Sequence, residues 1–159
     1  MIDPTLEFLY GLHNRGIKLG LKNIESFLKV CGNPQREIKT IHLAGTNGKG
    51  STASIISKIL QKNGYKVGLY TSPHLINFNE RVRVDGIPIS DEQIVNFIEK
   101  HKQTLVDSSI TFFEATTALA FKYFAEQNVD IAIIETGLGG RLDSTNVLSP
   151  MQTIITEIH

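Results

Sequence analysis

The sequence predicts an α/β protein whose mostly parallel sheet carries a phosphate-binding loop (P-loop) and helices on both faces. Three observations lead to this fold class. A strand, a glycine-rich loop, a helix and a second strand follow one another in residues 38–71, which is the building block of a parallel sheet. Another apolar strand, at 129–136, also runs into a glycine-rich loop. Helical patterns before and between these strands supply cover for both faces of the sheet.

The beginning of the chain predicts a helical segment. Residues 4–13 carry apolar side chains, Tyr10 among them, at helical spacing. Asn23 is placed to cap a second helix that ends near Cys31. We therefore expect an amino-terminal helical segment over residues 1–36, ahead of the sheet.

The first strand–loop–helix–strand unit follows from local signals. Residues 38–44 predict a strand and 49–63 a helix, which Gly64 is placed to end. Residues 67–71 predict the next strand, and 72–89 are mostly loop.

A short hairpin and a helix are predicted next. Residues 81–84 alternate between arginine and valine, as in a short strand, and Asp85-Gly86 is a hairpin-type turn. Ser90 begins a capping-box pattern that opens a helix to about Leu105.

The last third of the chain predicts a helix, two strands and a loop. Thr111 is placed to cap a helix over 112–127, and a buried strand follows at 129–136. A glycine-rich loop at 137–146 leads to a strand at 153–158. Because a parallel strand normally continues into a crossover helix, we expect the chain to be part of a longer protein.

Composition and charge indicate a globular cytoplasmic protein. Apolar residues make up 41% of the 159 residues, and 16 basic residues balance 16 acidic ones, so no net field favours nucleic acid or a membrane surface. No apolar run reaches the roughly 20 residues of a membrane span, and the amino terminus lacks a signal-peptide pattern. Cys31 is the only cysteine, which is typical of a reducing compartment. We expect a monomer that binds neither nucleic acid nor a membrane.

The strongest functional pattern is Gly-Thr-Asn-Gly-Lys-Gly-Ser-Thr at 45–52, between a strand and a helix. Glycines and a helix amino terminus present backbone N–H groups to phosphate oxygens. Lys49 is the candidate catalytic residue, since its ammonium group can reach the β- and γ-phosphates of ATP. The predicted ATP-binding residues are Thr46, Asn47, Gly48, Lys49, Gly50, Ser51 and Thr52. The alternative is a glycine-rich turn followed by a surface lysine, because the pattern departs from the standard P-loop at positions 43 and 50.

Four motifs in order resemble the folate-ligase branch of the Mur ligase superfamily, the folylpolyglutamate synthase/dihydrofolate synthases. They lie at 42–51, 70–83, 111–117 and 135–146, and the similarity extends from about residue 5 to 159. The resemblance implies a truncated Mur ligase-like central ATPase domain. It also implies that the rest of this domain, a modified lysine and a carboxy-terminal glutamate-binding domain are absent from the chain.

Two residues are candidate ligands of Mg²⁺. Glu135 ends an apolar strand, and carboxylates at strand ends of parallel sheets often hold ligands or metals. The resemblance assigns Ser72 as a second ligand and places a third, a histidine, three positions beyond His159. Alternatively, Glu135 is a solvated strand end and Ser72 an ordinary turn residue before proline.

The loop at 137–146 is a candidate substrate contact. Its glycine spacing does not match a dinucleotide fingerprint. The resemblance places Leu142, Asp143 and Ser144 beside a pteroate or folate substrate. Alternatively, Asp143 and Asn146 only stabilise a tight turn.

The resemblance places two further segments at the pteroate or folate pocket, Ile17, Lys18 and Leu19, and Thr111, Phe112, Phe113 and Glu114. A flat pterin ring suits stacking on a phenylalanine, although packing in the core is the favoured role for at least one of the two rings. Glu114 in a first helical turn also has a structural explanation.

The basic residues of the hairpin leave two interpretations open. Arg81 and Arg83 are able to hold a substrate carboxylate or phosphate, or they form the solvated face of a short strand. For His74 a surface or hydrogen-bonded position is favoured over catalysis, and His13 and His101 are expected to have no chemical role.

The resemblance implies an ATP-dependent carbon–nitrogen ligase. ATP would phosphorylate a carboxylate of dihydropteroate or tetrahydrofolate, and the amine of L-glutamate would attack the acyl phosphate. We expect little or no ligase activity from the 159-residue chain alone. The alternatives are another P-loop phosphotransferase and a non-catalytic nucleotide-binding remnant.

Overall fold

The computed structural model describes residues 2–16 and 20–159. The predicted substrate contacts Ile17, Lys18 and Leu19 lie outside these residues. In the described part of the chain, no helix has the length and apolar character needed to cross a membrane.

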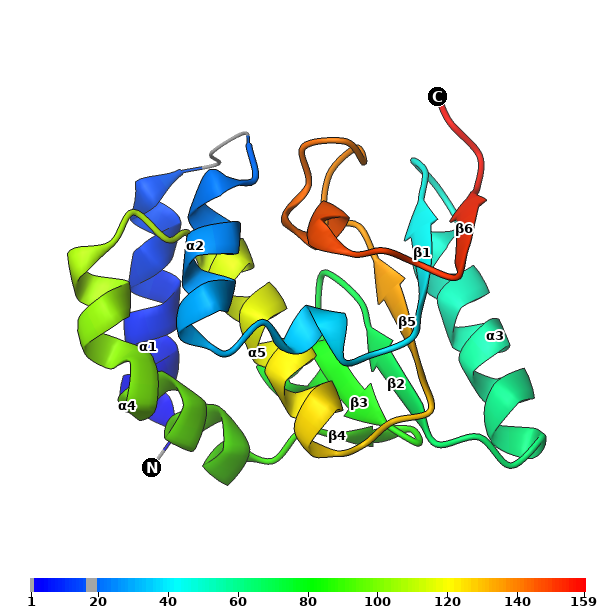
Figure 1. The fold of residues 1–159 in the computed structure, drawn as a ribbon, viewed down its shortest axis with the longest axis horizontal. Helices are drawn as coiled ribbons and strands as arrows, with labels where there is room; N and C mark the ends of the chain where they lie inside the picture. Colours follow the sequence, from blue (N-terminus) through cyan, green and yellow to red (C-terminus); the bar gives the residue numbers. More distant parts are fainter. Residues whose placement is uncertain (1, 17–19) are drawn as a thin grey trace.

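A six-stranded sheet forms the middle of the fold (Figure 1). Its strands are β1 (Thr40–Ala44), β2 (Val67–Tyr70), β3 (Val82–Val84), β4 (Ile87–Pro88), β5 (Ile131–Glu135) and β6 (Gln152–Ile155). They lie in the order β4-β3-β2-β5-β1-β6. The neighbours β2, β5, β1 and β6 are parallel, while β3 and β4 add an antiparallel hairpin at one edge. The predicted mostly parallel sheet is confirmed.

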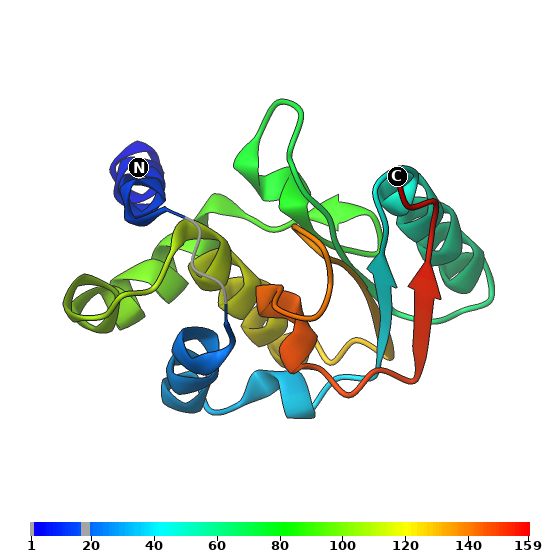
Figure 2. The same cartoon turned by 90° about the horizontal axis from the view of Figure 1, so that it is seen from above.

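Helices cover both faces of the sheet, as predicted (Figures 1 and 2). The α-helices are α1 (Asp3–Gly11), α2 (Lys22–Val30), α3 (Lys49–Lys62), α4 (Asp91–Asp107) and α5 (Phe112–Glu126). Short 3₁₀ helices are η1 (Leu12–Arg15), η2 (Pro34–Arg36), η3 (Phe78–Arg81) and η4 (Ser144–Val147). Helix α3 packs alone on one face, and α5 lies on the other with α1, α2 and α4 outside it.

The two faces bury cores of different size. Under α3, a small core includes Leu43, Ala53 and Ile133. The larger core on the other face centres on α5, whose Phe124 is fully buried. A Cβ at Gly68 of β2 would lie 2.8 Å from Cδ1 of Phe124, so the glycine lets α5 approach the sheet closely.

The starts of the helices follow the predicted capping patterns in part. Thr111 caps α5 through a complete capping box with Glu114. Ser90 caps α4 by accepting a hydrogen bond from the amide of Gln93, but the reciprocal side-chain bond of a full capping box is not among the contacts of this cap. The prediction that Asn23 caps α2 is wrong: Leu21 holds the N-cap position and Asn23 lies within the first turn.

Several strand boundaries differ from the sequence prediction. β5 begins at Ile131 rather than 129, because the chain first completes a turn in which the amide of Val129 bonds to the carbonyl of Phe124. β6 covers Gln152–Ile155 rather than 153–158. β3 begins at Val82, and Asp85 with Gly86 forms the predicted tight turn at positive φ.

The carboxyl ends of β1, β2, β5 and β6 meet at one edge of the sheet, at the top of Figure 1. The loops that follow these strands therefore converge. In doubly wound sheets this edge is where ligands bind.

Candidate functional site

The predicted phosphate-binding loop, residues 45–52, joins β1 to α3 at this edge. Gly48 is the N-cap residue of α3 and has a left-handed backbone (φ 80°) with no side-chain cap. The amide of Thr52 makes the first helical hydrogen bond, to the carbonyl of Gly48. The amides before it, at residues 49–51, have no acceptor within the helix, so this helix start suits an anion. Ser51 is exposed and Thr52 half-buried in the same turn.

The segment after β6 supports the loop from the other side. The carbonyl of Glu157 accepts hydrogen bonds from the amides of Thr46 (2.7 Å) and Asn47 (3.3 Å). The hydroxyl of Thr156 donates to the carbonyl of Asn47 at 2.7 Å. The amides of Thr46 and Asn47, two of the predicted ATP-binding residues, are therefore already engaged in this structure.

Lys49 folds back over its own loop. Its Nζ donates to the carbonyl of Gly45 at 2.8 Å and to that of Thr46 at 3.4 Å. The first of these bonds is half-buried and the second is exposed. Both acceptors are neutral carbonyls, so a charged phosphate can compete for the ammonium group.

Glu135 and Ser72 come together against the phosphate loop. Oε2 of Glu135 accepts a hydrogen bond from the amide of Ser72 at 3.0 Å. A Cβ built on Gly50 would lie 3.6 Å from the same oxygen, an ordinary van der Waals distance, so the first turn of α3 runs directly beside this carboxylate. The two candidate metal ligands therefore lie beside the 45–51 turn, on the same side of the sheet.

The carboxylate of Glu135 is only 4% exposed. Burial raises the pKa of Glu135, against the opposing effects of the Ser72 amide and the positive charge of Lys49. A carboxylate that has lost its water and faces a phosphate loop is a favourable position for a cation.

The donor set fits a magnesium ion shared with a nucleotide. No cluster of three or more His, Cys, Asp or Glu side chains suited to a metal occurs in the described residues. Mg²⁺ is commonly held by one or two protein oxygens, with phosphate oxygens and water completing its shell. One buried carboxylate and one hydroxyl beside a phosphate loop match that arrangement.

A cavity of about 370 Å³ opens next to Ser72. Aromatic rings form much of its wall: His13 stacks on Phe112 with ring centroids 4.0 Å apart, and Phe113 lies beside Phe112. The lining residues are His13, Gly16, Ser72, Pro73, Arg81, Thr111, Phe112, Phe113, Gly137, Leu138, Leu142, Asp143 and Ser144. Six of the predicted substrate contacts, from 111–113 and 142–144, thus share one cavity.

Glu114 is not one of these lining residues. It is 1% exposed, and its Oε2 accepts a hydrogen bond from the amide of Thr111 at 2.8 Å. The expected position of Glu114 in the first turn of a helix is confirmed, and its side chain also completes the capping box of α5. Contact with a substrate stays a prediction.

The loop after β5 is organised around Asp143. Its Oδ2 accepts from the amides of Gly137 (2.9 Å) and Leu138 (2.8 Å), and its Oδ1 accepts from the amide (3.0 Å) and hydroxyl (2.6 Å) of Thr145. Asn146 donates to the carbonyl of Arg141 at 3.0 Å. The turn-stabilising interpretation of Asp143 and Asn146 is therefore confirmed, and Asp143 reaches the cavity as part of this network.

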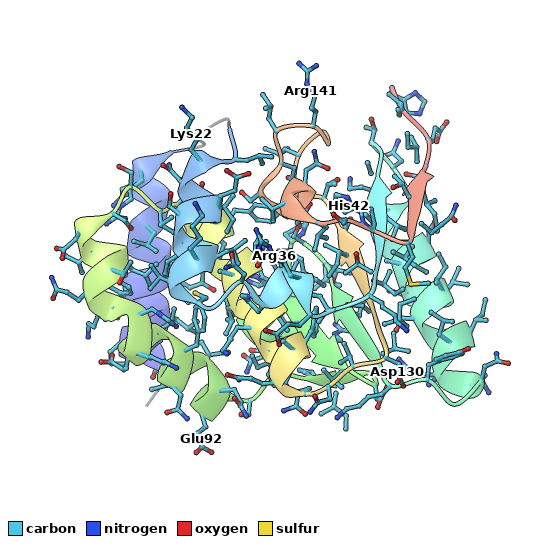
Figure 3. All side chains as sticks on the ribbon, viewed as in Figure 1. Lys22, Arg36, His42, Glu92, Asp130 and Arg141 are labelled. Carbon is cyan, nitrogen blue, oxygen red and sulfur yellow. The ribbon has the colours of Figure 1, made fainter. Side chains whose placement is uncertain are left out.

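His42 of β1 continues the network into the sheet (Figure 3). Its Nε2 lies 2.7 Å from the hydroxyl of Thr145. Burial lowers the pKa of His42, with the nearby charge of Asp143 acting in the opposite direction. The imidazole of His42 thus ties the loop to the strand that carries the phosphate loop.

Sequence reasoning did not assign His13 to the site, and it left Arg81 open. His13 lies in η1 and Arg81 ends η3. Both line the cavity, although their segments are far in sequence from the lining residues at 111–113 and 137–144. His74 accepts a hydrogen bond from Arg81, which confirms the expectation of a hydrogen-bonded histidine. The interpretation of Arg81 as part of a solvated strand face is wrong, because it is 7% exposed.

Comparisons with known proteins identify close relatives. The chain is 48% identical over 158 residues to a dihydrofolate synthase/folylpolyglutamate synthase of Bacillus subtilis, covering 95% of this chain and 37% of that protein. It superposes on a folylpolyglutamate synthase of Thermotoga maritima with a TM-score of 0.91 at 48% identity, covering 98% of this chain and 38% of that one.

A third relative was solved with ligands bound. It is a folylpolyglutamate synthase in complex with AMPPCP and folate, with a TM-score of 0.88 at 39% identity, and the match covers 99% of this chain and 40% of that one. The chain spans well under half the length of these relatives. No protein-family profile matches it.

Proposed function

This chain is a homologue of part of the folylpolyglutamate synthase/dihydrofolate synthases, and from that premise we propose that it forms the ATP- and acceptor-binding part of an ATP-dependent ligase. The ligase joins L-glutamate to the carboxylate of dihydropteroate or tetrahydrofolate. The proposal depends on one observation: Glu135, Ser72 and Gly50 lie close together beside a cavity lined by aromatic rings.

The proposed reaction begins with phosphoryl transfer. The substrate carboxylate attacks the γ-phosphorus of ATP, the bond to the β,γ-bridging oxygen breaks, and ADP leaves. The amine of glutamate then attacks the acyl phosphate, inorganic phosphate leaves, and an amide bond remains. Phosphoryl transfer depends mainly on positioning and on neutralising charge.

The residues of this chain have three tasks in that scheme. Lys49 exchanges the carbonyls of Gly45 and Thr46 for phosphate oxygens, and the amides at the start of α3 hold the phosphate chain. Mg²⁺, held by Ser72 and Glu135, would neutralise phosphate charge when bound. The cavity wall of Phe112 and Phe113 excludes water and orients a flat acceptor.

The proposed partners are ATP, L-glutamate and a pteroate or folate acceptor, and the proposed form is a cytoplasmic monomer. The proposal of a reducing compartment is supported by the single cysteine, Cys31, which leaves the chain without an internal disulfide.

A nucleotide-binding measurement tests the first half of the proposal. Calorimetric titration of the chain with ATP is expected to show tighter binding with MgCl₂ than with EDTA. The Glu135→Gln variant is expected to lose this difference while still binding ATP. Equal affinities in the two buffers for the wild-type chain would contradict the metal assignment.

An activity assay tests the second half. The natural protein of full length that contains this chain is expected to convert dihydropteroate or tetrahydrofolate only when both ATP and glutamate are present. Phosphate transfer to an acceptor without any need for glutamate would favour a phosphotransferase instead.

A further inference from the structure

Arg81 is a buried cation on the wall of the aromatic cavity. Its side chain is 7% exposed, and the guanidinium carbon lies 5.1 Å from the centroid of the Phe112 ring. It lines the same cavity as Ser72 and Phe113. Charged side chains this deeply buried are normally paired with an opposite charge or fully hydrogen-bonded.

Arg81 has no such partner within residues 2–16 and 20–159. Its one side-chain hydrogen bond runs from Nε to Nδ1 of His74, at 2.8 Å. None of the ion pairs in that part of the chain includes it. Burial lowers the pKa of Arg81. Both terminal nitrogens are left as donors.

The position of Arg81 relates it to the proposed reaction centre. The carbonyl of Arg81 accepts a hydrogen bond from the amide of Thr71 at 3.0 Å. Thr71 is the neighbour of Ser72, whose amide bonds to Glu135. Arg81 therefore belongs to the part of the cavity wall that adjoins the phosphate loop.

The neighbouring Arg83 is arranged differently. Its Nε donates to the carbonyl of Glu80 at 3.0 Å, it is half-buried, and it is not among the residues that line the cavity. Two arginines two positions apart thus differ in what they face, which makes Arg83 a matched control.

We infer that Arg81 is the carboxylate-recognising residue of this cavity. Its two terminal nitrogens receive the carboxylate of an aromatic acid whose ring lies against Phe112 and Phe113. A planar guanidinium matches a carboxylate with two parallel hydrogen bonds, and the bond to His74 fixes the plane of the fork. The inference rests on the proposed function for the identity of the acid, and it adds which residue holds the carboxylate beside Ser72.

The test uses two small ligands of the same shape, 4-aminobenzoate and 4-aminobenzamide, which differ in charge. Each is titrated into ¹⁵N-labelled wild-type chain and into the Arg81→Gln, Arg81→Lys and Arg83→Gln variants, with amide shifts around the cavity as the readout. We expect the wild type to bind the benzoate about 10- to 100-fold more tightly than the benzamide, from the strength of charged hydrogen bonds. R81Q should remove this preference, R81K should keep only part of it, and R83Q should leave it intact.

The outcomes separate the inference from the proposed function. Equal binding of the two ligands by the wild type, or an unchanged preference in R81Q, overturns the inference even if the ligase assay succeeds. A retained benzoate preference that needs Arg81 supports it even if no glutamate is ever transferred. If R81Q does not fold, the comparison of ligands in the wild type and in R81K still decides. Inorganic phosphate that displaces the benzoate from the cavity at equal concentration would also overturn the assignment to a carboxylate.

Discussion

Replacing Asp143 should destabilise the chain strongly in the absence of any ligand. Its carboxylate is 6% exposed and accepts four hydrogen bonds, from the amides of Gly137, Leu138 and Thr145 and from the hydroxyl of Thr145. Asp143→Ala leaves all four donors without this acceptor. We expect a loss of about 3–5 kcal/mol, the cost of breaking a buried charged network.

The variant Asp143→Asn keeps the shape of the side chain but removes its negative charge, so it measures how much of the stability depends on that charge. The amide keeps one acceptor oxygen, but its NH₂ group faces the donors that the other carboxylate oxygen served. The expected loss is about 2–3 kcal/mol, since roughly half the bonds survive without their charge. Asn146→Ala is the control in the same loop, because it removes one exposed bond, to the carbonyl of Arg141, and should cost about 0.5–1 kcal/mol.

Urea unfolding followed by far-ultraviolet circular dichroism measures these losses, since the chain has no tryptophan for fluorescence. With a slope of about 2 kcal/mol per molar urea, D143A should lower the midpoint by about 1.5–2.5 M. A D143A midpoint equal to that of the wild type would refute the reasoning. It would mean that Asp143 is held for a ligand and contributes nothing to the fold.

Three further predictions concern other parts of the fold. Gly137→Ala places a Cβ 2.5 Å from the ring of Phe113 and should lower the free energy of unfolding by about 1–3 kcal/mol. The control Gly11→Ala meets no atom within 4 Å and should raise it by about 0.5–1 kcal/mol. Equal urea midpoints of the two variants would count against this packing argument. Burial lowers the pKa of His101 from 6.5, and the positive charges of Lys100 and Lys122 act in the same direction. His101 therefore binds a proton more readily in the unfolded chain than in the folded one, and the folded state loses stability as pH falls below about 6.5. Unfolding midpoints between pH 7.5 and 5.5 should therefore fall more steeply in the wild type than in His101→Gln, and parallel curves would contradict this. Lys49→Gln removes the half-buried hydrogen bond to the carbonyl of Gly45 and should lower the unfolding temperature of the ligand-free chain by about 2–4 °C, the effect of about 1 kcal/mol. It should also abolish the increase in unfolding temperature that MgATP produces in the wild type. An undiminished increase would remove Lys49 from the phosphate site.

The parts of the site that sequence predicted correctly depend on local geometry. A glycine-rich loop between a strand and a helix presents free amides wherever the helix packs, and Thr111 with Glu114 forms a capping box from residues three apart. The parallel arrangement of β1, β2 and β5 then brings their carboxyl ends to one edge. The residues of the glycine-rich loop and of the capping box lie within a few positions of each other, so the linear sequence shows both patterns.

The features that sequence left open or missed depend on contacts between distant segments. Arg81 alternates with Val82 in the way that a half-solvated strand does, and only the packing of η3 against α5 turns it toward the cavity. His13 gains its position by stacking on Phe112, a contact between residues 99 positions apart in the printed sequence. The spacing of apolar residues along the sequence does not predict a contact between two residues this far apart.

The amino-acid sequence by itself determined the α/β order, the phosphate loop and the residues placed at the strand ends, because backbone preferences and short spacings act before the chain is folded. The tertiary structure alone decided which groups are free to act. It engaged the amide of Asn47 with Glu157 and bound Asp143 into its own loop. Among the residues that the structure describes, it gave the buried guanidinium of Arg81 a bond to His74 and no counter-charge. Whether a hydrogen-bond donor or a charge has a partner depends on every segment that packs around it, and those segments come together only in the folded chain.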